Sequence, residues 1–192
     1  ASLLESDLEI TPLQLAERIA ARTPRVVGFS VYLWNVRLIE ATVRILRVVA
    51  PDMRLAAGGP ELTDDYPNAD LFDAVIAGEG ERAFRAFCET VLTGEGDPPR
   101  SSLLVNKTGE DLETLALPYD LYTDTDLTQR TVYVETSRGC PFSCADCTSA
   151  GTGLRLMPLD RLLPAFDKLW RRGLRRFKFL DRSFNAPVKH AC

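Results

Sequence analysis

The sequence has 192 residues, of which 45% are hydrophobic and 26% are charged, and its formal net charge is −4 at pH 7. This composition is typical of soluble globular proteins and is sufficient for one large core or two small ones. The acidic balance gives no long-range attraction for phosphate backbones, so we expect no nucleic-acid partner. No apolar run approaches the roughly 20 residues that cross a bilayer, and the N-terminus lacks a secretory pattern. We therefore expect a cytoplasmic protein without membrane contact.

The first half of the chain alternates predicted strands and helices. Thr11-Pro12 predicts a helix start, because the hydroxyl can cap the first turn and proline fits there. A valine-rich run after Arg25 predicts a strand buried on both faces. The predicted elements are, in order, a strand in 1–10, a helix in 12–21, a strand in 25–30, a helix in 36–49, strands in 53–57 and 72–77, and a helix that follows Glu81. Such alternation favours a parallel α/β sheet covered by helices.

Loops rich in glycine and polar residues follow three of these strands. In parallel sheets, ligands bind beyond the carboxyl ends of the strands, and glycine lets the backbone approach a ligand closely. The candidate cofactor-binding residues on this edge are Ser30, Asn35, Gly58, Gly59, Pro60, Gly78, Glu79 and Gly80. Taken singly, the glycines are also explained by tight turns.

A change of composition marks the end of this region. Residues 94–130 begin with glycine and proline and continue as polar and acidic sequence that includes Pro118-Tyr119-Asp120. We predict a linker there. The chain then divides into an N-terminal α/β domain in 1–93, the linker in 94–130, and a C-terminal domain in 131–192.

Three of the five cysteines follow a predicted strand in 131–134. They are Cys140, Cys144 and Cys147, and they lie within eight positions of one another. Cysteine sulfur is the usual ligand of iron–sulfur clusters, and three such ligands leave one iron of a 4Fe-4S cluster open. The motif therefore predicts a cluster on a strand-end loop.

Two alternatives to a cluster remain. Zinc also accepts thiolates, but structural zinc normally takes four ligands, and the only histidine, His190, lies far along the chain. A disulfide is disfavoured by the reducing cytosol. Of the other cysteines, Cys88 falls on the apolar side of a predicted helix and is assigned to the core, and Cys192 is the last residue.

The segment Glu135-Thr-Ser-Arg-Gly-Cys140-Pro-Phe-Ser-Cys144-Ala-Asp-Cys147 closely resembles the cluster motif of the radical S-adenosylmethionine (SAM) superfamily. The resemblance implies that SAM chelates the open iron and that Phe142 and Asp146 lie beside it. An aromatic residue usually precedes the third cysteine in that family, where it contacts the adenine side of SAM. Asp146 departs from this pattern.

The sequence after the cysteines predicts a helix and a second strand. Asp160 is predicted to cap a helix that ends near Gly173, and 176–180 is the following strand. These elements resemble the start of the radical SAM partial (β/α) barrel. Residues just after barrel strands face the active site, so Asp181, Ser183 and Asn185 are candidates to contact SAM. A simple strand-terminating turn is the alternative.

The N-terminal domain resembles the cobalamin-binding domain of cobalamin-dependent radical SAM proteins. The matching segments are Val27-Gly-Phe-Ser-Val-Tyr-Leu-Trp-Asn35, Ala57-Gly-Gly-Pro-Glu61 and Ala77-Gly-Glu-Gly-Glu-Arg-Ala-Phe84. The resemblance implies a flavodoxin-like, Rossmann-type fold that holds the corrin over the strand ends. The Asp-x-His-x-x-Gly motif, which supplies a histidine to cobalt, has no counterpart here, and neither has the first strand of such domains.

The predicted fold is thus α/β, with a partial flavodoxin-like cobalamin-binding domain followed by the start of a radical SAM barrel. The resemblance implies a radical SAM enzyme with a 4Fe-4S cluster, SAM and cobalamin as cofactors, an external electron donor of flavodoxin or ferredoxin type, and methyl transfer to a substrate that the sequence does not name. The alternatives are a radical SAM enzyme without cobalamin and a non-catalytic cluster- or corrinoid-binding protein.

Overall fold

The computed structural model describes residues 2–94, 102–106, 108–147 and 149–191. The chain forms two compact units, one over Ala1–Glu110 and one over Asp111–Cys192. In the described part of the chain, no helix has the length and apolar character that a membrane crossing requires.

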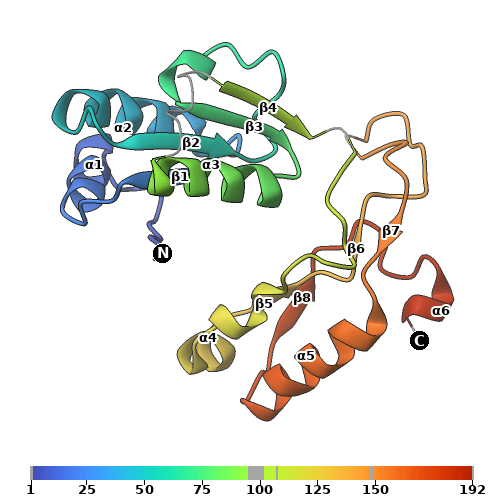
Figure 1. The fold of residues 1–192 in the computed structure, drawn as a ribbon. Helices are drawn as coiled ribbons and strands as arrows, with labels where there is room; N and C mark the ends of the chain where they lie inside the picture. The colour runs from blue at the N-terminus through green and yellow to red at the C-terminus, as the bar shows by residue number, and fades with distance from the viewer. Residues whose placement is uncertain (1, 95–101, 107, 148, 192) are drawn as a thin grey trace. The chain divides into compact units, whose positions relative to one another are not determined.

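The first unit is a sheet of four parallel strands in the order β1-β2-β3-β4, with three helices around it (Figure 1). Its elements are α1 (Pro12–Ala20), β1 (Val26–Ser30), α2 (Val36–Val49), β2 (Arg54–Gly58), the 3-10 helix η1 (Ala69–Leu71), β3 (Ala74–Gly78), α3 (Glu81–Thr93) and β4 (Ser102–Asn106). The prediction of a parallel α/β sheet is confirmed. Helix α1 begins with the expected cap, because the Thr11 side chain accepts a hydrogen bond from the Gln14 amide in a capping box.

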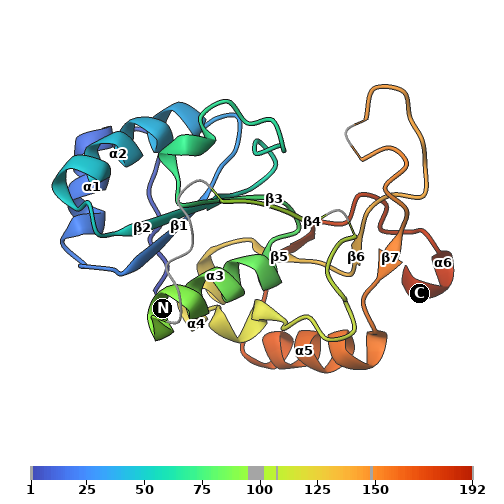
Figure 2. The same cartoon turned by 45° about the horizontal axis from the view of Figure 1, so that its top comes forward.

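The two faces of this sheet carry different cores. Figure 2 shows α1 and α2 on one face and α3 on the other. Leu55 packs under α1 and α2 in the larger cluster, whereas its neighbour Ala56 points to the opposite face with Phe87 of α3. The alternation follows from the two-residue period of a strand. Small side chains on the second face let α3 approach closely, since a β-carbon at Gly28 would lie 2.7 Å from the Phe84 ring.

A buried carboxylate ties the amino ends of β2 and β3 together. Asp73 is 0% exposed and lies 2.9 Å from Arg47 and 3.1 Å from Arg54. Its Oδ2 also accepts a 2.7 Å hydrogen bond from the Leu55 amide. A buried carboxylate needs such partners because desolvation without them is costly. These contacts therefore hold the amino ends of β2 and β3 together, at the end of the sheet opposite the glycine-containing loops.

The second unit contains a strand–helix–strand arrangement with parallel strands. Its elements are η2 (Pro118–Leu121), α4 (Asp124–Gln129), β5 (Val132–Val134), β6 (Ser137–Arg138), β7 (Arg155–Leu156), α5 (Leu159–Arg171), β8 (Phe177–Phe179) and α6 (Val188–Ala191). β5 pairs in parallel with β8, and β6 pairs antiparallel with β7. Its core consists of Leu112, Tyr119, Leu127, Val132, Val134, Met157, Leu162, Leu169 and Leu174.

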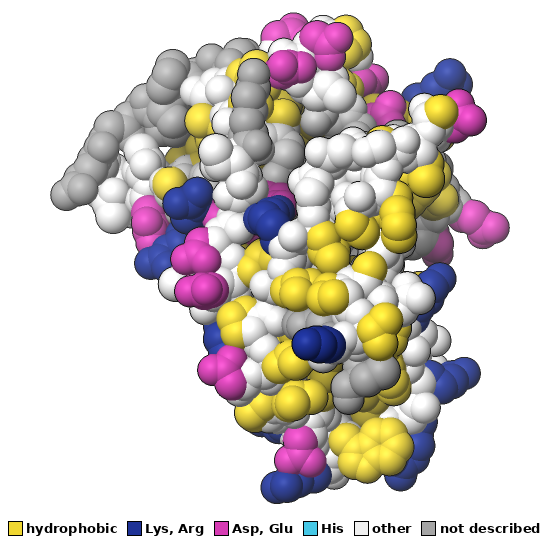
Figure 3. Space-filling view, turned by 90° about the vertical axis from the view of Figure 1, so that its right-hand side faces the viewer, with side chains coloured by type: hydrophobic (Ala, Val, Ile, Leu, Met, Phe, Trp, Pro, Cys, Tyr) yellow, Lys and Arg dark blue, Asp and Glu magenta, His cyan; other side chains and the backbone are white. Residues whose placement is uncertain are grey.

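Hydrophobic side chains also remain on the surface of the second unit. Figure 3 shows hydrophobic side chains gathered over the middle and lower part of the face that it draws. The exposed members in this unit include Tyr133 of β5, Phe177 of β8, and Leu163 and Trp170 of α5. On α5, Leu162 and Leu169 are buried, whereas Leu163 and Trp170 are exposed.

Several expectations differ from the structure. Residues 2–10 are coil and turn rather than a strand, and β1 is partly exposed because it pairs only with β2 among the described strands. The described parts of 94–130 do not form one linker, since β4 belongs to the first sheet and η2 and α4 belong to the second unit. Asp160 lies in the first turn of α5, whose N-cap is Pro158, and makes no side-chain cap.

Candidate functional site

The two ends of the cysteine loop lie close together, at a constriction that we call the neck of the loop. The neck is formed by the antiparallel strands β6 and β7, in which Ser137 pairs with Leu156 and Arg138 pairs with Arg155. Gly139 follows β6 with a φ of +81°, and a β-carbon there would lie 1.8 Å from the Gly153 carbonyl oxygen. Only glycine fits this position.

Cys140 is the buried member of the three motif cysteines, and a hydrogen bond holds its backbone. Its side chain is buried, at 8% exposed, whereas Cys144 and Cys147 are exposed. The Cys140 amide donates to the Thr152 hydroxyl at 3.2 Å, which connects the two ends of the loop. Hydrogen bonds from the Ser183 hydroxyl and the Phe142 amide, together with the charge of Arg182, lower the pKa of the Cys140 thiol. Such surroundings favour the thiolate, which is the form that binds metal.

The carboxyl ends of β5 and β8 meet at the base of this loop. The Asp181 carboxylate, which follows β8, accepts hydrogen bonds from the Thr136 amide at 3.0 Å and from the Thr136 and Ser137 hydroxyls at 2.5 Å. Two residues later, the Ser183 oxygen lies 3.3 Å from the Cys140 sulfur. The predicted exit loop therefore does lie beside the cysteine motif, although Asp181 and Ser183 contact protein groups there.

A buried tyrosine supports the strand end that precedes the loop. The Tyr119 hydroxyl donates to the Glu135 carbonyl and accepts from the Glu135 amide, both at 3.0 Å. The carboxylate of Glu135 is held by Arg138, with the Arg138 Nε 3.1 Å from its Oε1. This role of Tyr119 was not predicted from the sequence, because the polar, proline-containing segment around it is typical of a linker.

The remaining predicted residues of the loop lie on its surface. Phe142 and Asp146 are exposed, and Asp146 occupies a turn. Among the described residues, no three His, Cys, Asp or Glu side chains form a group that could hold a metal ion. Convergence of Cys140, Cys144 and Cys147 on one cluster thus stays a prediction.

The second candidate region is the carboxyl edge of the first sheet. The register aligns Ser30 with Gly58, and Gly78 with Asn106, so the predicted loops do lie along one rim. The loop after β1 is shaped by Asn35, whose side chain accepts from the Tyr32 amide at 2.8 Å and donates to the Ser30 carbonyl at 3.0 Å.

This first loop also presents apolar side chains to solvent. Leu33 and Trp34 are 76% and 67% exposed, and the Trp34 ring stacks on Tyr32 with centroids 4.6 Å apart. Exposed apolar side chains at the carboxyl edge of a parallel sheet make this loop a candidate contact for a large ligand. Neither residue was predicted from the sequence as a site residue, although both lie in a strand-end loop.

The rim glycines have different functions. A β-carbon at Gly59, whose φ is +124°, would lie 2.4 Å from the Val31 carbonyl oxygen, and one at Gly78 would lie 2.6 Å from the Asn106 carbonyl oxygen. Both glycines are therefore required by neighbouring backbone. At Gly58 a β-carbon would meet only Ile76 at 3.8 Å or more, and Gly80 is the N-cap of α3. Gly58 is thus the rim glycine whose small size the protein itself does not require.

A polar network joins the last two rim loops. Glu79 accepts a 2.7 Å hydrogen bond from the Glu110 amide, and the buried Glu110 carboxylate lies 2.7 Å from Arg82. Asn106 donates to both the Glu79 carbonyl and the Glu110 carboxylate at 3.0 Å. Glu79 therefore fixes the rim. Asn106 and Glu110 were not predicted, since they lie in the range interpreted as a linker.

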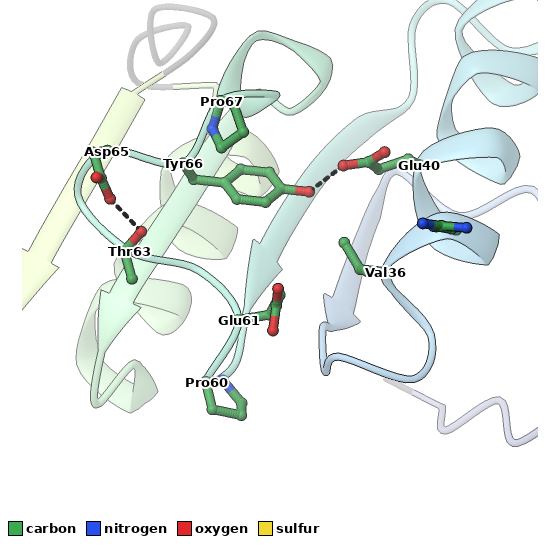
Figure 4. A pocket seen from close by; sticks show the side chains of 9 residues that line it. Val36, Glu40, Pro60, Glu61, Thr63, Asp65, Tyr66 and Pro67 are labelled. Atoms are coloured by element: carbon green, nitrogen blue, oxygen red, sulfur yellow. Dashed lines mark hydrogen bonds between the residues drawn. The ribbon is translucent and has the colours of Figure 1, made fainter. Parts of the chain in front are cut away.

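A pocket of about 550 Å³ opens between the start of α2 and the loop after β2 (Figure 4). Its lining consists of Val36, Arg37, Glu40, Pro60, Glu61, Thr63, Asp65, Tyr66 and Pro67. The Tyr66 hydroxyl points to Glu40 and donates to it at 2.5 Å, and burial and Glu40 raise the pKa of Tyr66. Three carboxylates and one guanidinium line the pocket, so it suits a polar group that donates hydrogen bonds rather than an anion. Pro60 is the predicted rim residue that reaches it.

Comparison with known proteins identifies the first unit. Residues 3–88 match the B12 binding domain family. The chain is 28% identical over 189 residues to the cobalamin-dependent radical SAM methyltransferase TokK of Streptomyces tokunonensis, covering 84% of this chain and 28% of TokK. Over most of its length, the chain is thus similar to a cobalamin-dependent radical SAM methyltransferase.

Two further proteins to which this chain is similar are methyl-transferring enzymes by name. It is 29% identical to 2-(S-pantetheinyl)-carbapenam-3-carboxylate methyltransferase of Streptantibioticus cattleyicolor, over 72% of this chain and 24% of the relative. It is 28% identical to hopanoid C-3 methylase of Methylococcus capsulatus, over 79% of this chain and 33% of the relative. The chain spans about a quarter to a third of the length of these three relatives.

The residue types at the two candidate sites suit a cluster and a corrinoid. Cys140, Cys144 and Cys147 provide three thiols on one loop, and the Cys140 side chain is buried. In the first unit, the rim exposes apolar area at Leu33 and Trp34. The mixed α/β architecture with a parallel sheet is confirmed, whereas assignment of β5–α5–β8 to a barrel stays a prediction.

Proposed function

We propose that this chain acts in a cobalamin-dependent radical SAM enzyme that methylates its substrate. The observation that carries the proposal lies in the second unit, where the ends of β5 and β8 converge on the base of a three-cysteine loop through Asp181 and Ser183. A B12-binding domain precedes that loop in the same chain. The two features together favour the combined chemistry over either cofactor alone.

In the second unit, the chain's own residues would hold and shield the cluster. Cys140, Cys144 and Cys147 would ligate three irons, and the exposed turn that carries the last two would fold toward the buried Cys140. The Asp181 bonds keep the exit of β8 against the loop base. When bound, the cluster and SAM supply the one-electron chemistry. An external donor of flavodoxin or ferredoxin type would provide the electron.

In the first unit, the rim would support a corrinoid. Leu33 and Trp34 would cover apolar ring surface, and Gly58 would leave room for close approach of the backbone. The acidic pocket beside Pro60 would accept hydrogen bonds from the amide groups at the periphery of a corrinoid. The corrinoid supplies methyl-transfer chemistry when bound.

Anaerobic reconstitution with iron, sulfide and hydroxocobalamin tests the proposal. We expect absorption bands of both a 4Fe-4S cluster and a corrinoid after desalting, with iron and sulfide contents that match one cluster per chain. Cluster bands without corrinoid would favour a radical SAM protein that does not use cobalamin. Both cofactors without SAM-dependent turnover would favour a non-catalytic binding protein, and neither cofactor would refute the proposal.

A further inference from the structure

The hydroxyl of Ser183 contacts a predicted cluster ligand from outside the cysteine loop. Its oxygen lies 3.3 Å from the Cys140 sulfur, within hydrogen-bond distance for sulfur. In the free thiol either atom can be the donor. A sulfur bound to iron is a thiolate and has no proton, so the hydroxyl must then donate.

Two features fix the geometry of this contact. Cys140 is buried, and its amide is held by Thr152 at 3.2 Å. On the other side, Asp181 is bound through three hydrogen bonds to Thr136 and Ser137, which keeps the segment that carries Ser183 at the loop base. The backbone segments that carry Cys140 and Ser183 are therefore both held in place by hydrogen bonds. Cys144 and Cys147 lie on the exposed turn and have no comparable hydroxyl contact in the described structure.

We propose that Ser183 is a positioning residue that donates a hydrogen bond to the Cys140 thiolate of the bound cluster and raises the cluster's reduction potential. The inference rests on the proposed function. Reduction adds one electron from an external donor and makes the cluster more negative, so a donor to its sulfur ligand stabilises the reduced form more than the oxidised form. Hydrogen bonds to the sulfurs are one of the factors that set the potential of such clusters, and bonds to charged acceptors are stronger than neutral ones.

The test is a redox titration of the reconstituted full chain. Dithionite with mediators serves as reductant, and the cluster is followed by visible absorption and by the paramagnetic signal of its reduced form. We expect Ser183→Ala to have a more negative midpoint potential than the wild type. A tenfold fall in the ratio of reduced to oxidised cluster at the wild-type midpoint corresponds to a shift of about 59 mV for one electron. Ser183→Thr keeps the hydroxyl and should stay near the wild type.

Ser143→Ala is the matched control, because Ser143 is an exposed serine of the cysteine loop. Its potential should not change. A normal potential in cluster-loaded Ser183→Ala, or equal shifts in both alanine variants, would overturn the inference. Should Ser183→Ala fail to take up a cluster, Ser183→Thr and Ser183→Val make the same comparison at nearly equal side-chain volume, and equal potentials in that pair would overturn it.

The test also separates this inference from the proposed function. A wild-type chain that contains no iron or sulfide after reconstitution would refute the proposed function and the inference with it. If the wild-type chain contains a cluster and the variants without the hydroxyl have the same reduction potential as the wild type, only the inference would be refuted.

Discussion

Gly139 passes so close to Gly153 that a β-carbon on Gly139 would lie 1.8 Å from the Gly153 carbonyl oxygen. The contact closes the neck of the cysteine loop between β6 and β7, immediately before the buried Cys140. The neck sets where the first sulfur lies relative to the ends of β5 and β8. The glycine therefore shapes the candidate cluster site, although it contributes no ligand.

Gly139→Ala should open this neck and reduce the cluster content after reconstitution to a minor fraction of the wild-type value. Gly151→Ala is the control, because Gly151 also has a positive φ, of +69°, but has no atom within 4 Å of its virtual β-carbon. The control carries only the backbone strain, about 1 kcal/mol. Iron and sulfide analysis measures both variants, and equal losses would contradict a role for the close contact.

Replacing any one of Cys140, Cys144 or Cys147 by alanine should remove most of the 4Fe-4S absorption. Cys88→Ala should retain it, because Cys88 lies in α3 of the first unit and packs there half-buried. Cys192 lies outside the described residues, and from the sequence we expect Cys192→Ala to retain the cluster as well. Visible spectra of the reconstituted variants decide the assignment, and an equal loss in Cys88→Ala would contradict it.

The sequence predicted most elements of the first sheet because their signals are local. Valine-rich strands, the Thr11 cap and the glycine turns depend on neighbours in the chain, and the parallel arrangement then follows from alternation. What the sequence did not predict depends on contacts between distant segments. The Tyr119 hydroxyl that bonds to Glu135 and the buried Glu110 beside Arg82 both lie in a range whose polar composition favours a linker.

The functions of the rim glycines could not be separated from sequence for the same reason. A glycine required by a ligand and one required by an adjacent loop have the same local pattern. In the structure, a β-carbon at Gly59 would overlap the backbone of Val31, whereas one at Gly58 would make only an ordinary contact with Ile76. At the cysteine loop, the spacing of the motif identified the donor set, whereas the contact of Ser183 with Cys140 depends on the pairing of β5 with β8.

Gly58 and Gly59 provide a matched pair of variants to test the proposed corrinoid site. Gly58→Ala should leave the free energy of unfolding nearly unchanged and weaken hydroxocobalamin binding, by about tenfold for a loss of about 1.4 kcal/mol, because the methyl group would meet the ligand rather than protein. Gly59→Ala should instead destabilise the first unit, since its β-carbon overlaps Val31. Urea unfolding and cobalamin titration measure the two effects, and unchanged binding in Gly58→Ala would mean that this glycine is only a turn.

Asp73→Asn should lower the stability of the first unit by about 2–3 kcal/mol. The substitution removes the charge that Arg47 and Arg54 approach at 2.9 and 3.1 Å, and breaking one side of a buried pair is strongly destabilising. Both arginine side chains are partly exposed, at 19% and 18%, which reduces the loss. Asp70→Asn, at an exposed position, is the control. Urea midpoints compare the two, and equal midpoints would show that the buried pair adds little.

Asp146 stands where the resembling family usually has an aromatic residue, and it lies exposed in the turn between Cys144 and Cys147. If this turn folds over bound SAM, Asp146→Phe should change the affinity for SAM, because an aromatic ring would pack against the adenine and a carboxylate would accept a hydrogen bond from its amino group. With about 1 to 3 kcal/mol for one such polar contact, the change is measurable by calorimetric titration of the reconstituted protein. Tighter binding in the variant would show that the aspartate does not contribute to binding, and weaker binding would show that it contacts SAM. Unchanged affinity would place the side chain away from SAM and would contradict the position that the resemblance implies for this loop.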